Sequence, residues 1–507
     1  MARSHDQALN QNGGRPIRRL VVVSNRLPVV LSRAGRGWSI EPGSGGLVTA
    51  LAPVLRNRGG IWIGWPGATD RKGLNEAVRD ATARTGYELV PVSFTPEEVD
   101  RHYRGFSNEV LWPLFHDLQS HCNFDPSYWS VYQDVNRKFA SAVIENTTQN
   151  DFVWVHDYHL MLVARELRAM GRKSKVAFYL HIPFPPLDIF TKLPWRSEIL
   201  RALLEYDLIG FQTMRDRRNF VQCLRAFEGD VGRCGRGQVC ELSIPNREIR
   251  IGAFPISIDY EDFEERARSR EVAESAWHIH EQFPDQQIIL GIDRLDYTKG
   301  IPMRLEAFRR AIQQFPELRR KVTLVQIVVP SRRGIPEYEA LKTRIETLVG
   351  EINGELTQNG WNPIHYIYRS LKPVTLLGFY RTAEIALVTP LKDGMNLVAK
   401  EYCASSLEED GVLILSEFAG AVSELQEGAL LVNPYDIVGV ANVIREAAHM
   451  DRSERQRRMR RLRKTVRKHD IFWWVDSFLL AAIATSLDSF PVIDDYTPDF
   501  DPVAEGG

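Results

Sequence analysis

The chain has 507 residues, of which 44% are hydrophobic and 25% charged, with a formal net charge of −1. That length exceeds one ordinary hydrophobic core and predicts two domains of roughly 200–250 residues. The near-neutral charge excludes a strong general attraction to nucleic acid or to an anionic membrane, and no apolar stretch approaches the ~20 residues that span a bilayer. Cys234 and Cys240 could in principle pair, but the cysteines have neither a CxxC nor a metal-ligand spacing, so we interpret them as reduced thiols of a cytoplasmic protein. They are Cys122, Cys223, Cys234, Cys240 and Cys403.

Short apolar runs rich in β-branched residues alternate along the chain with segments of helical period. Continuously apolar strands are typical of parallel sheets that helices cover on both faces. The sequence therefore predicts an α/β protein with two doubly wound, Rossmann-like domains, which would face each other across a ligand cleft. The expected strands are Leu20–Ser24, Phe152–His156, Val176–His181, Ile288–Ile292, Val322–Val329, Ile385–Thr389 and Val412–Ser416.

A charged helical segment from Asp259 separates the two series of strands. We therefore predict a flexible extension over residues 1–17, an N-terminal domain over 18–258 and a C-terminal domain over 259–470. A packing helix over residues 471–487 and an acidic, disordered tail over 488–507 would follow.

The first candidate site lies at the end of the first expected strand, at Arg26. Gly45 and Gly46 then open a helix. Glycines before a helix let backbone N–H groups approach an anion, and an arginine at the strand exit favours phosphate. The spacing is neither the dinucleotide fingerprint nor the P-loop, so an ordinary strand-to-helix turn stays as an alternative.

The second candidate site contains Asp157, after the strand that ends at His156, and His181, one strand–helix unit later. Asp157 can accept hydrogen bonds from sugar hydroxyls, and His181 can donate to an oxygen near a reacting carbon. With His159, the two histidines also suggest a metal-dependent hydrolase, but their spacing matches no familiar zinc pattern. A capping aspartate and buried structural histidines are the simpler alternative.

The third candidate site is the strand exit that carries Arg294 and Lys299. A guanidinium and an ammonium that converge on one anion would suit a diphosphate leaving group. The alternative is a pair of solvated cations with Asp293 and Asp296 as local partners.

The fourth candidate site is a loop between a strand that ends at Thr389 and the helix that follows. Its backbone N–H groups could bind phosphate or sugar oxygens, and its two carboxylates could hold sugar and ribose hydroxyls. A capping aspartate and a solvated glutamate are the alternative. The residues concerned are Asp393, Gly394, Met395, Asn396, Leu397 and Glu401.

The segment Arg452–Lys468 holds ten basic residues and one acidic residue. This pattern could indicate a nucleic-acid patch, but no aromatic residue interrupts the charges. A solvated helix face is therefore favoured.

Taken together, the motifs resemble those of the trehalose-6-phosphate synthase family of retaining glycosyltransferases, whose fold is the two-domain GT-B type. The resemblance covers residues 18 to 485. It rests on VVVSNR, GGL, YRGFSNEVLWPLFH, HDYHL, LHIPFP, GFQT, RLDYTKG, PSR, DGMNLVAKEY and SEFAGA.

The resemblance implies a donor site made of the third and fourth candidate sites, here called the third and fourth motifs, together with Gly45 and Gly46. It implies an acceptor site on Arg26, Tyr103, Trp112, Asp157 and Arg332, with His181 and Gln212 near the reaction centre. The implied catalytic residues are Asp157, His181, Arg294 and Lys299.

The implied activity is transfer of glucose, with retention, from a nucleotide-glucose to glucose 6-phosphate. The donor's base stays open among UDP-, ADP- and GDP-glucose. We expect a metal-independent front-face mechanism without a cofactor, because no further carboxylate is available as a nucleophile. We also expect a cytoplasmic homo-oligomer that binds neither nucleic acid nor membrane. Three alternatives stay open: a retaining glucosyltransferase of the same fold with another acceptor, the metal-dependent hydrolase, and a catalytically silent sugar-phosphate sensor.

Overall fold

The computed structural model describes residues 19–34, 37–43, 46–70, 72–229, 231–232, 235, 237–244, 247–332, 335–484, 486–487, 490–491 and 496. Its contacts divide the chain into two compact units. Unit 1 comprises Met1–Pro255 and Phe472–Ile493, and unit 2 comprises Ile256–Ile471 and Asp494–Gly507. The sequence places this boundary after residue 258. The expected extension over residues 1–17 and most of the expected tail over 488–507 lie outside the described residues.

Unit 1 is built on a sheet whose central strands are buried along their whole length. When the strands of this sheet are numbered along the chain, the first six stand in the order 3-2-1-4-5-6 across the sheet, which is the Rossmann arrangement. The last strand in the row is antiparallel to its neighbour, and all other pairings are parallel. The row is β5 (Glu88–Pro91), β4 (Gly60–Trp65), β1 (Leu20–Arg26), β6 (Phe152–His156), β7 (Val176–Tyr179), β8 (Leu208–Phe211), β10 (Arg247–Ala253) and β9 (Val239–Ile244).

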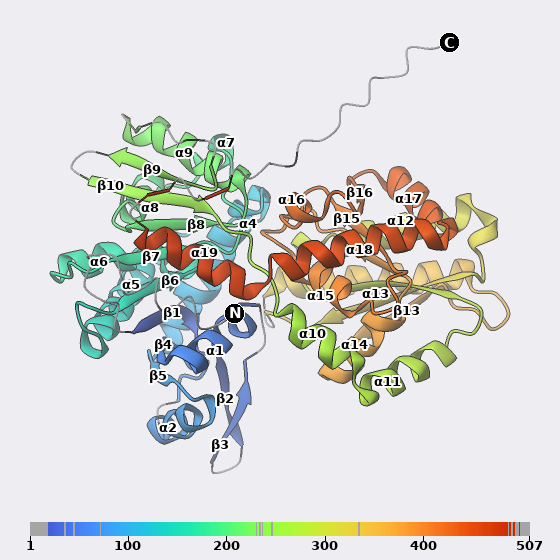
Figure 1. The fold of residues 1–507 in the computed structure, drawn as a ribbon, viewed down its shortest axis with the longest axis horizontal. Helices are drawn as coiled ribbons and strands as arrows, with labels where there is room; N and C mark the ends of the chain where they lie inside the picture. The colour runs from blue at the N-terminus through green and yellow to red at the C-terminus, as the bar shows by residue number, and fades with distance from the viewer. Residues whose placement is uncertain are drawn as a thin grey trace. The chain divides into compact units, whose positions relative to one another are not determined.

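Helices surround this sheet, and a separate hairpin joins β2 (Val29–Ala34) to β3 (Gly37–Pro42) (Figure 1). The segment η1 (Val99–Leu111) is a π-helix, a form that is rare at this length. The other helices of unit 1 are α1 (Gly46–Arg58), α2 (Leu74–Thr85), α3 (Pro96–Glu98), α4 (Trp112–Phe115), η2 (Gln119–His121), α5 (Ser127–Asn146), η3 (Tyr158–Leu160), α6 (Val163–Ala169), α7 (Leu187–Phe190), α8 (Arg196–Leu203) and α9 (Met214–Glu228).

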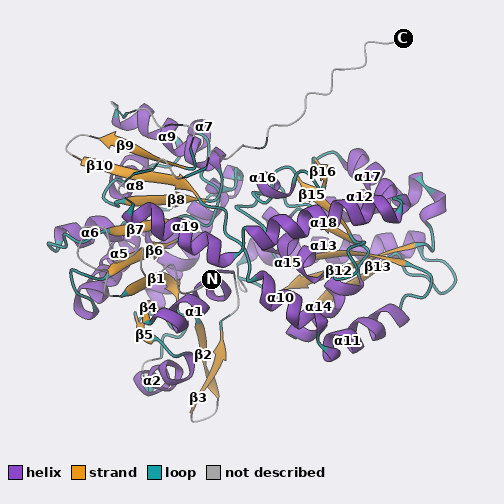
Figure 2. Ribbon diagram, in the orientation of Figure 1, coloured by secondary structure: helices purple, strands orange, loops and turns teal. Residues whose placement is uncertain are grey.

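Unit 2 repeats the Rossmann strand order in a sheet whose pairings are parallel. Figure 2 shows helices beside the strands of this unit. Its core lies between this sheet and the covering helices, with Ile289, Phe308 and Leu324 fully buried. The row is β13 (Ile364–Tyr368), β12 (Val322–Val329), β11 (Gln287–Arg294), β14 (Ile385–Val388), β15 (Val412–Ser416) and β16 (Leu430–Val432). All seven expected strands are thereby confirmed across the two units.

The helices of unit 2 alternate with these strands, because parallel strands must be joined by crossover connections, which are usually helical. They are α10 (Tyr260–Arg268), α11 (Arg270–Glu281), η4 (Tyr297–Lys299), α12 (Ile301–Gln314), η5 (Pro316–Leu318), α13 (Pro336–Leu356), α14 (Pro373–Thr382), α15 (Leu397–Ser405), α16 (Val422–Leu425), α17 (Ile437–His449) and α18 (Arg452–Lys468).

The basic helix α18 is tied to its surroundings by ion pairs. Arg463 is buried, donates to three backbone carbonyls and pairs with Glu264 at 2.5 Å. Arg460 pairs with Glu409 at 2.6 Å. Carboxylates therefore neutralise part of a segment that looks uniformly cationic in the sequence.

The last helix, α19 (Ile471–Ile483), leaves unit 2 and packs on the unit 1 sheet (Figure 1). The Phe478 ring stacks on Trp154 of β6 at 4.2 Å, and the Trp474 indole donates to the Phe254 carbonyl at 3.1 Å. At this helix the chain therefore returns from unit 2 to unit 1.

The prediction of reduced thiols is wrong at one position. Cys240, on the edge strand β9, is disulfide-bonded, whereas Cys122, Cys223 and Cys403 are free. Proximity in the folded chain, which the spacing of cysteines does not report, decides pairing. Among the described residues, no helix combines the length and hydropathy needed to cross a membrane.

Candidate active site

Each sheet has a topological switch point, where the strand order reverses. It lies between β1 and β6 in unit 1, and between β11 and β14 in unit 2. Ligands of open α/β sheets bind beyond the carboxyl ends of strands at such points. Arg26 ends β1 and Asp157 follows β6. In unit 2, Arg294 ends β11 and Asp393 lies in the loop after β14. All four predicted site segments therefore occupy switch points.

The third and fourth motifs meet through Lys299 and Asp393. Lys299 ends the short helix η4, and its ammonium forms an ion pair with the Asp393 carboxylate. The side chains are 11% and 14% exposed, so water screens the pair weakly. The Asn396 amide donates to the same carboxylate oxygen at 3.1 Å. Two loops that are distant in the sequence are thus joined at the unit 2 switch point.

Asp296 is the buried carboxylate at the centre of the predicted cations. Burial alone would raise its pKa, but attraction from Arg332, Lys299 and Arg294 outweighs burial and lowers the pKa. The Arg332 guanidinium lies 3.4 Å from the carboxylate and also donates to the Tyr338 hydroxyl. The structure therefore gathers three predicted site cations around one carboxylate within unit 2.

The loop from Asp393 to Leu397 is held by the SEFAGA segment. The Gly420 N–H donates to the Asp393 carbonyl at 3.0 Å, and Ala421 donates to the Met395 carbonyl at 2.8 Å. A Cβ atom on Gly420 would lie 1.8 Å from the Gly394 carbonyl oxygen, so only glycine fits there. The contact fixes the path of the loop.

Asn396 caps the start of helix α15. Its backbone has a φ of 75°, and its side-chain oxygen accepts from the Ala399 N–H at 3.3 Å. The other N–H groups of the first helical turn have no acceptor within a helix and favour an anion or a sugar oxygen. Leu397, the first residue of α15, therefore lies where the sequence predicts a ligand-binding backbone.

Arg304, which sequence reasoning missed, holds together the two loops that carry Lys299 and Asp393. Its guanidinium is fully buried and forms an ion pair with Asp293. It also donates to the Thr389 hydroxyl at 3.0 Å and to the Lys299 carbonyl at 3.3 Å. Burial raises the pKa of Asp293 in spite of Arg304, so this pair is held against a large desolvation cost. The network connects the ends of β11 and β14.

Glu401 lies one turn into α15, where its carboxylate accepts from the Tyr380 hydroxyl at 2.8 Å. Burial raises the pKa of Glu401, and the Tyr380 hydrogen bond opposes that rise. A carboxylate in this setting can exchange its tyrosine partner for a ligand hydroxyl. No hydrogen bond connects Glu401 to Lys299 or Asp393 in the described structure.

In unit 1, Asp157 and His181 are brought together. Asp157 has a φ of 75°, which is uncommon for a residue other than glycine and often marks a functional position. Its carboxylate accepts the His181 backbone N–H at 3.2 Å. Burial lowers the pKa of the His181 imidazole to about 3, so the ring is neutral at ordinary pH.

Arg26 lies over an aromatic platform that the sequence did not reveal. Its guanidinium carbon is 4.4 Å from the centre of the Trp65 ring, and Trp65 contacts the Tyr103 ring at 5.9 Å. Burial lowers the pKa of Arg26, and nearby Tyr103 opposes that change. A Cβ atom on Gly67 would touch the guanidinium, so this glycine leaves room for the cation.

A row of rings connects Tyr103 to the other predicted aromatic residue, Trp112. Tyr103 stacks on His159 at 5.9 Å, His159 contacts Tyr158 at 4.0 Å, and Tyr158 contacts Trp112 at 5.8 Å. Trp112 is 6% exposed and packs mainly as a core residue. Asp157 is adjacent to this row in the sequence, so the predicted acceptor residues of unit 1 form one connected group.

Two glycines and one glutamine complete the predicted set. Gly45 lies outside the described residues, and Gly46 is the first residue of α1. Gln212 is buried, accepts from the Tyr179 hydroxyl at 2.8 Å and donates to the His181 carbonyl at 3.4 Å. It therefore supports the His181 segment. Within the described residues, no group of three or more His, Cys, Asp or Glu side chains is arranged to hold a metal ion.

Comparison with known protein families identifies the chain. The model of glycosyltransferase family 20 matches residues 18–483. The chain belongs to glycosyltransferase family 20. Because this match includes both units, the family assignment applies to nearly the whole described chain.

Similarity to named proteins extends over most of their length. The trehalose-6-phosphate synthase of Mycobacterium sp. (strain JLS) is 42% identical over 471 residues, which cover 92% of this chain and 96% of that protein. The enzyme of that name from Mycolicibacterium smegmatis is 42% identical over 473 residues, covering 92% of each protein.

Solved structures of trehalose-phosphate synthases have a similar fold. An α,α-trehalose-phosphate synthase (UDP-forming) from Burkholderia xenovorans, in complex with glucose-6-phosphate, aligns with a TM-score of 0.82 at 33% identity, covering 92% of this chain and 99% of that one. A trehalose-6-phosphate synthase from E. coli, bound with UDP-2-fluoro glucose, aligns with a TM-score of 0.81 at 33% identity, covering 92% and 98%. The predicted GT-B class with two Rossmann-like units is confirmed.

Proposed function

We propose that this chain transfers glucose from a nucleotide-glucose to glucose 6-phosphate with retention, forming α,α-trehalose 6-phosphate and a nucleoside diphosphate. The observation that carries the proposal is the meeting of the third and fourth motifs at the unit 2 switch point, through Lys299 and Asp393. Membership of glycosyltransferase family 20 and the ligands of its solved members support the choice of substrates.

The proposed donor site uses unit 2. Lys299 and Arg294 would stabilise the charge that develops on the leaving diphosphate, and the start of α15 would add backbone N–H groups. Lys299 keeps further N–H donors after it has paired with Asp393, so it can contact both the carboxylate and a phosphate. Asp393 would accept from glucose hydroxyls, and Glu401 from ribose hydroxyls.

The stereochemistry favours attack on the face that the diphosphate leaves. Donor and product both carry an α-linked glucose, so the configuration at the anomeric carbon is retained. A double displacement needs a carboxylate nucleophile at that carbon. Asp393 is bound by Lys299 and Asn396, and Asp157 accepts the His181 N–H. We therefore propose that the leaving phosphate oxygen takes the acceptor's proton and that no metal or other cofactor is needed.

The proposed acceptor site uses Arg26, Tyr103, Trp112 and Asp157 of unit 1, together with Arg332. Arg26 is exposed at the end of β1, where its guanidinium can form charge-assisted hydrogen bonds to a phosphate, which are stronger than hydrogen bonds between neutral groups. Arg332 is held by Asp296 and Tyr338, so it would reach the phosphate only by sharing its fork of N–H groups. Action in the cytoplasm and a homo-oligomeric state are further parts of the proposal.

An acceptor comparison tests this function. Purified enzyme receives UDP-, ADP- or GDP-glucose with either glucose 6-phosphate or glucose, and release of nucleoside diphosphate is measured. Two charge-assisted contacts, discounted for overlap, correspond to ~10²–10⁴-fold higher kcat/KM for glucose 6-phosphate. Arg26→Ala should reduce this ratio mainly by weakening the phosphorylated acceptor. Equal use of glucose and glucose 6-phosphate would contradict the proposal, as would transfer to a different acceptor.

A further inference from the structure

The His156 side chain lies beside His181, one of the residues of the proposed site. It is the last residue of β6, is fully buried, and pairs across the sheet with Tyr179 of β7. This register places His181, two residues beyond Tyr179, beside it. The His156 Nδ1 atom lies 3.1 Å from the His181 Nε2 atom, which is hydrogen-bond distance.

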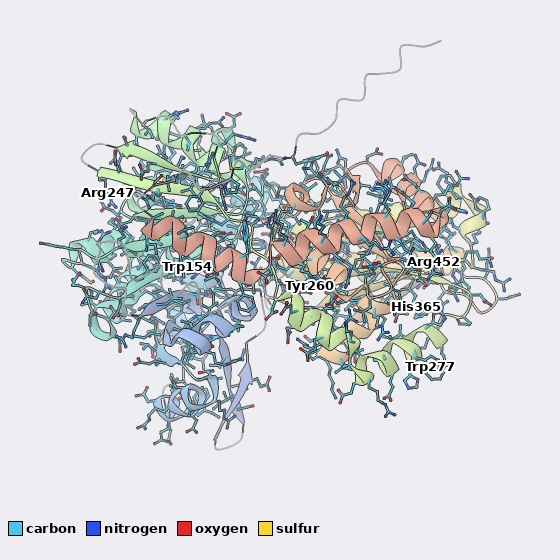
Figure 3. All side chains as sticks on the ribbon, in the orientation of Figure 1. Trp154, Arg247, Tyr260, Trp277, His365 and Arg452 are labelled. Atoms are coloured by element: carbon cyan, nitrogen blue, oxygen red, sulfur yellow. The ribbon has the colours of Figure 1, made fainter. Side chains whose placement is uncertain are left out.

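The surroundings of His156 are aromatic. The Trp154 ring lies 4.7 Å from the imidazole, and Trp474 of α19 lies 6.5 Å away (Figure 3 labels Trp154). The second nitrogen, Nε2, is buried and has no hydrogen-bond partner among the residues that the structure describes. Burial holds the pKa of His156 well below its usual range, with His181 lowering it further, so one shared proton lies between two neutral rings.

That proton can be carried by either ring, and the two arrangements differ at His156 Nε2. If His181 donated, the proton of His156 would sit on Nε2 and leave a buried N–H without an acceptor, which native structures largely avoid. If His156 donates from Nδ1, its Nε2 carries only a lone pair. The second arrangement leaves no buried donor unsatisfied.

We propose that His156 is a positioning residue that fixes the tautomer of His181. By donating to His181 Nε2, it places the His181 proton on Nδ1. His181 is half-buried, its backbone N–H is fixed by Asp157, and no hydrogen bond from the described residues reaches Nδ1. His181 therefore presents an Nδ1–H donor to a substrate oxygen instead of a basic nitrogen. The activity readout of this inference rests on the proposed function.

Isosteric substitutions test the assignment. The amide nitrogen of asparagine can replace histidine Nδ1, and that of glutamine can replace Nε2. His156→Asn should therefore retain kcat within a few-fold, whereas His156→Gln and His156→Leu should lower kcat by about 10-fold, the effect of one lost hydrogen bond of ordinary strength. If His156 only filled space, the larger glutamine would be the better replacement. A glutamine variant as active as the asparagine variant, or more so, would overturn the proposal.

A direct measurement separates this inference from the proposed function. Neutron diffraction of the wild-type protein should show a proton on His181 Nδ1 and none on its Nε2. A proton on His181 Nε2 would refute the inference whatever the enzyme's activity. Nucleoside diphosphate affinity, assigned to unit 2, and circular dichroism report whether the variants fold. If they do not, the neutron result alone decides. Absence of glucose transfer by the wild type would instead refute the proposed function.

Discussion

Replacing Lys299 by methionine should separate a catalytic role from a structural one. The change keeps most of the side-chain stem and removes the charge that pairs with Asp393. Because both side chains are more than four-fifths buried, the lost charge-assisted hydrogen bond should cost ~1.5–3 kcal/mol in the free energy of unfolding. If Lys299 also stabilises the leaving diphosphate, kcat should fall by ~10²–10³-fold.

A double-mutant cycle with Asp393→Asn makes the test sharper. Unfolding in urea should show coupling between the two positions, because the charges contact each other. The losses of kcat should be nearly additive, since the two groups would contact different parts of the donor. Lys342→Met is the control, because Lys342 pairs with Glu346 on the exposed face of α13 and should change neither property appreciably. Loss of stability with near-normal kcat in Lys299→Met would show that the pair is purely structural.

Three further predictions address the loop, the buried carboxylate and metals. Gly420→Ala should push the Gly394 carbonyl aside, destabilise the fold by ~1–3 kcal/mol and raise the KM for nucleotide-glucose. The control Gly354→Ala, which has open space around it in helix α13, should instead stabilise the fold by ~0.5–1 kcal/mol. A normal KM in Gly420→Ala would contradict the loop assignment. Asp296→Asn should lower the free energy of unfolding by ~3 kcal/mol at neutral pH. Because folding lowers the pKa of Asp296, this stability is present above the unfolded pKa of about 3.9 and is lost as the pH falls through the folded pKa. Urea melts of wild type and variant should therefore converge as the pH falls, and a constant difference would argue against the charge effect. Activity should survive exhaustive chelation, and a loss that Mg²⁺ or Mn²⁺ restores would refute the metal-free mechanism.

The fold could be predicted where apolar runs are long and uninterrupted. The expected strands Phe152–His156 and Val322–Val329 coincide with β6 and β12, because parallel strands buried on both faces are rich in apolar, β-branched residues. The π-helix Val99–Leu111 could not be predicted, since its hydrogen-bond pattern leaves no distinct apolar period in the sequence.

Only the site residues at or just after the ends of strands could be predicted from the sequence. Arg26 and Lys299 follow buried strands and were recognised there. Arg304 was not, because an arginine inside an amphipathic helix suggests a surface position. Its acceptor Thr389 is 85 residues away along the chain, so only the fold brings them together. The same holds for Trp65 beneath Arg26.

The His156–His181 contact shows the same limit. The sequence placed both histidines at strand ends and left a metal site as an alternative. The parallel register of β6 and β7 decides instead that one imidazole hydrogen-bonds the other. Register between strands depends on packing across the whole sheet, and a single sequence does not report it.

The most direct test of the account is the identity of the product. Enzyme given nucleotide-glucose labelled with ¹³C in the glucose, together with unlabelled glucose 6-phosphate, should yield a phosphorylated disaccharide. Its NMR spectrum should show two α-configured anomeric centres, one of them labelled. A β-configured labelled centre, a free reducing end, or labelled glucose released by hydrolysis would contradict transfer with retention to the anomeric hydroxyl of glucose 6-phosphate.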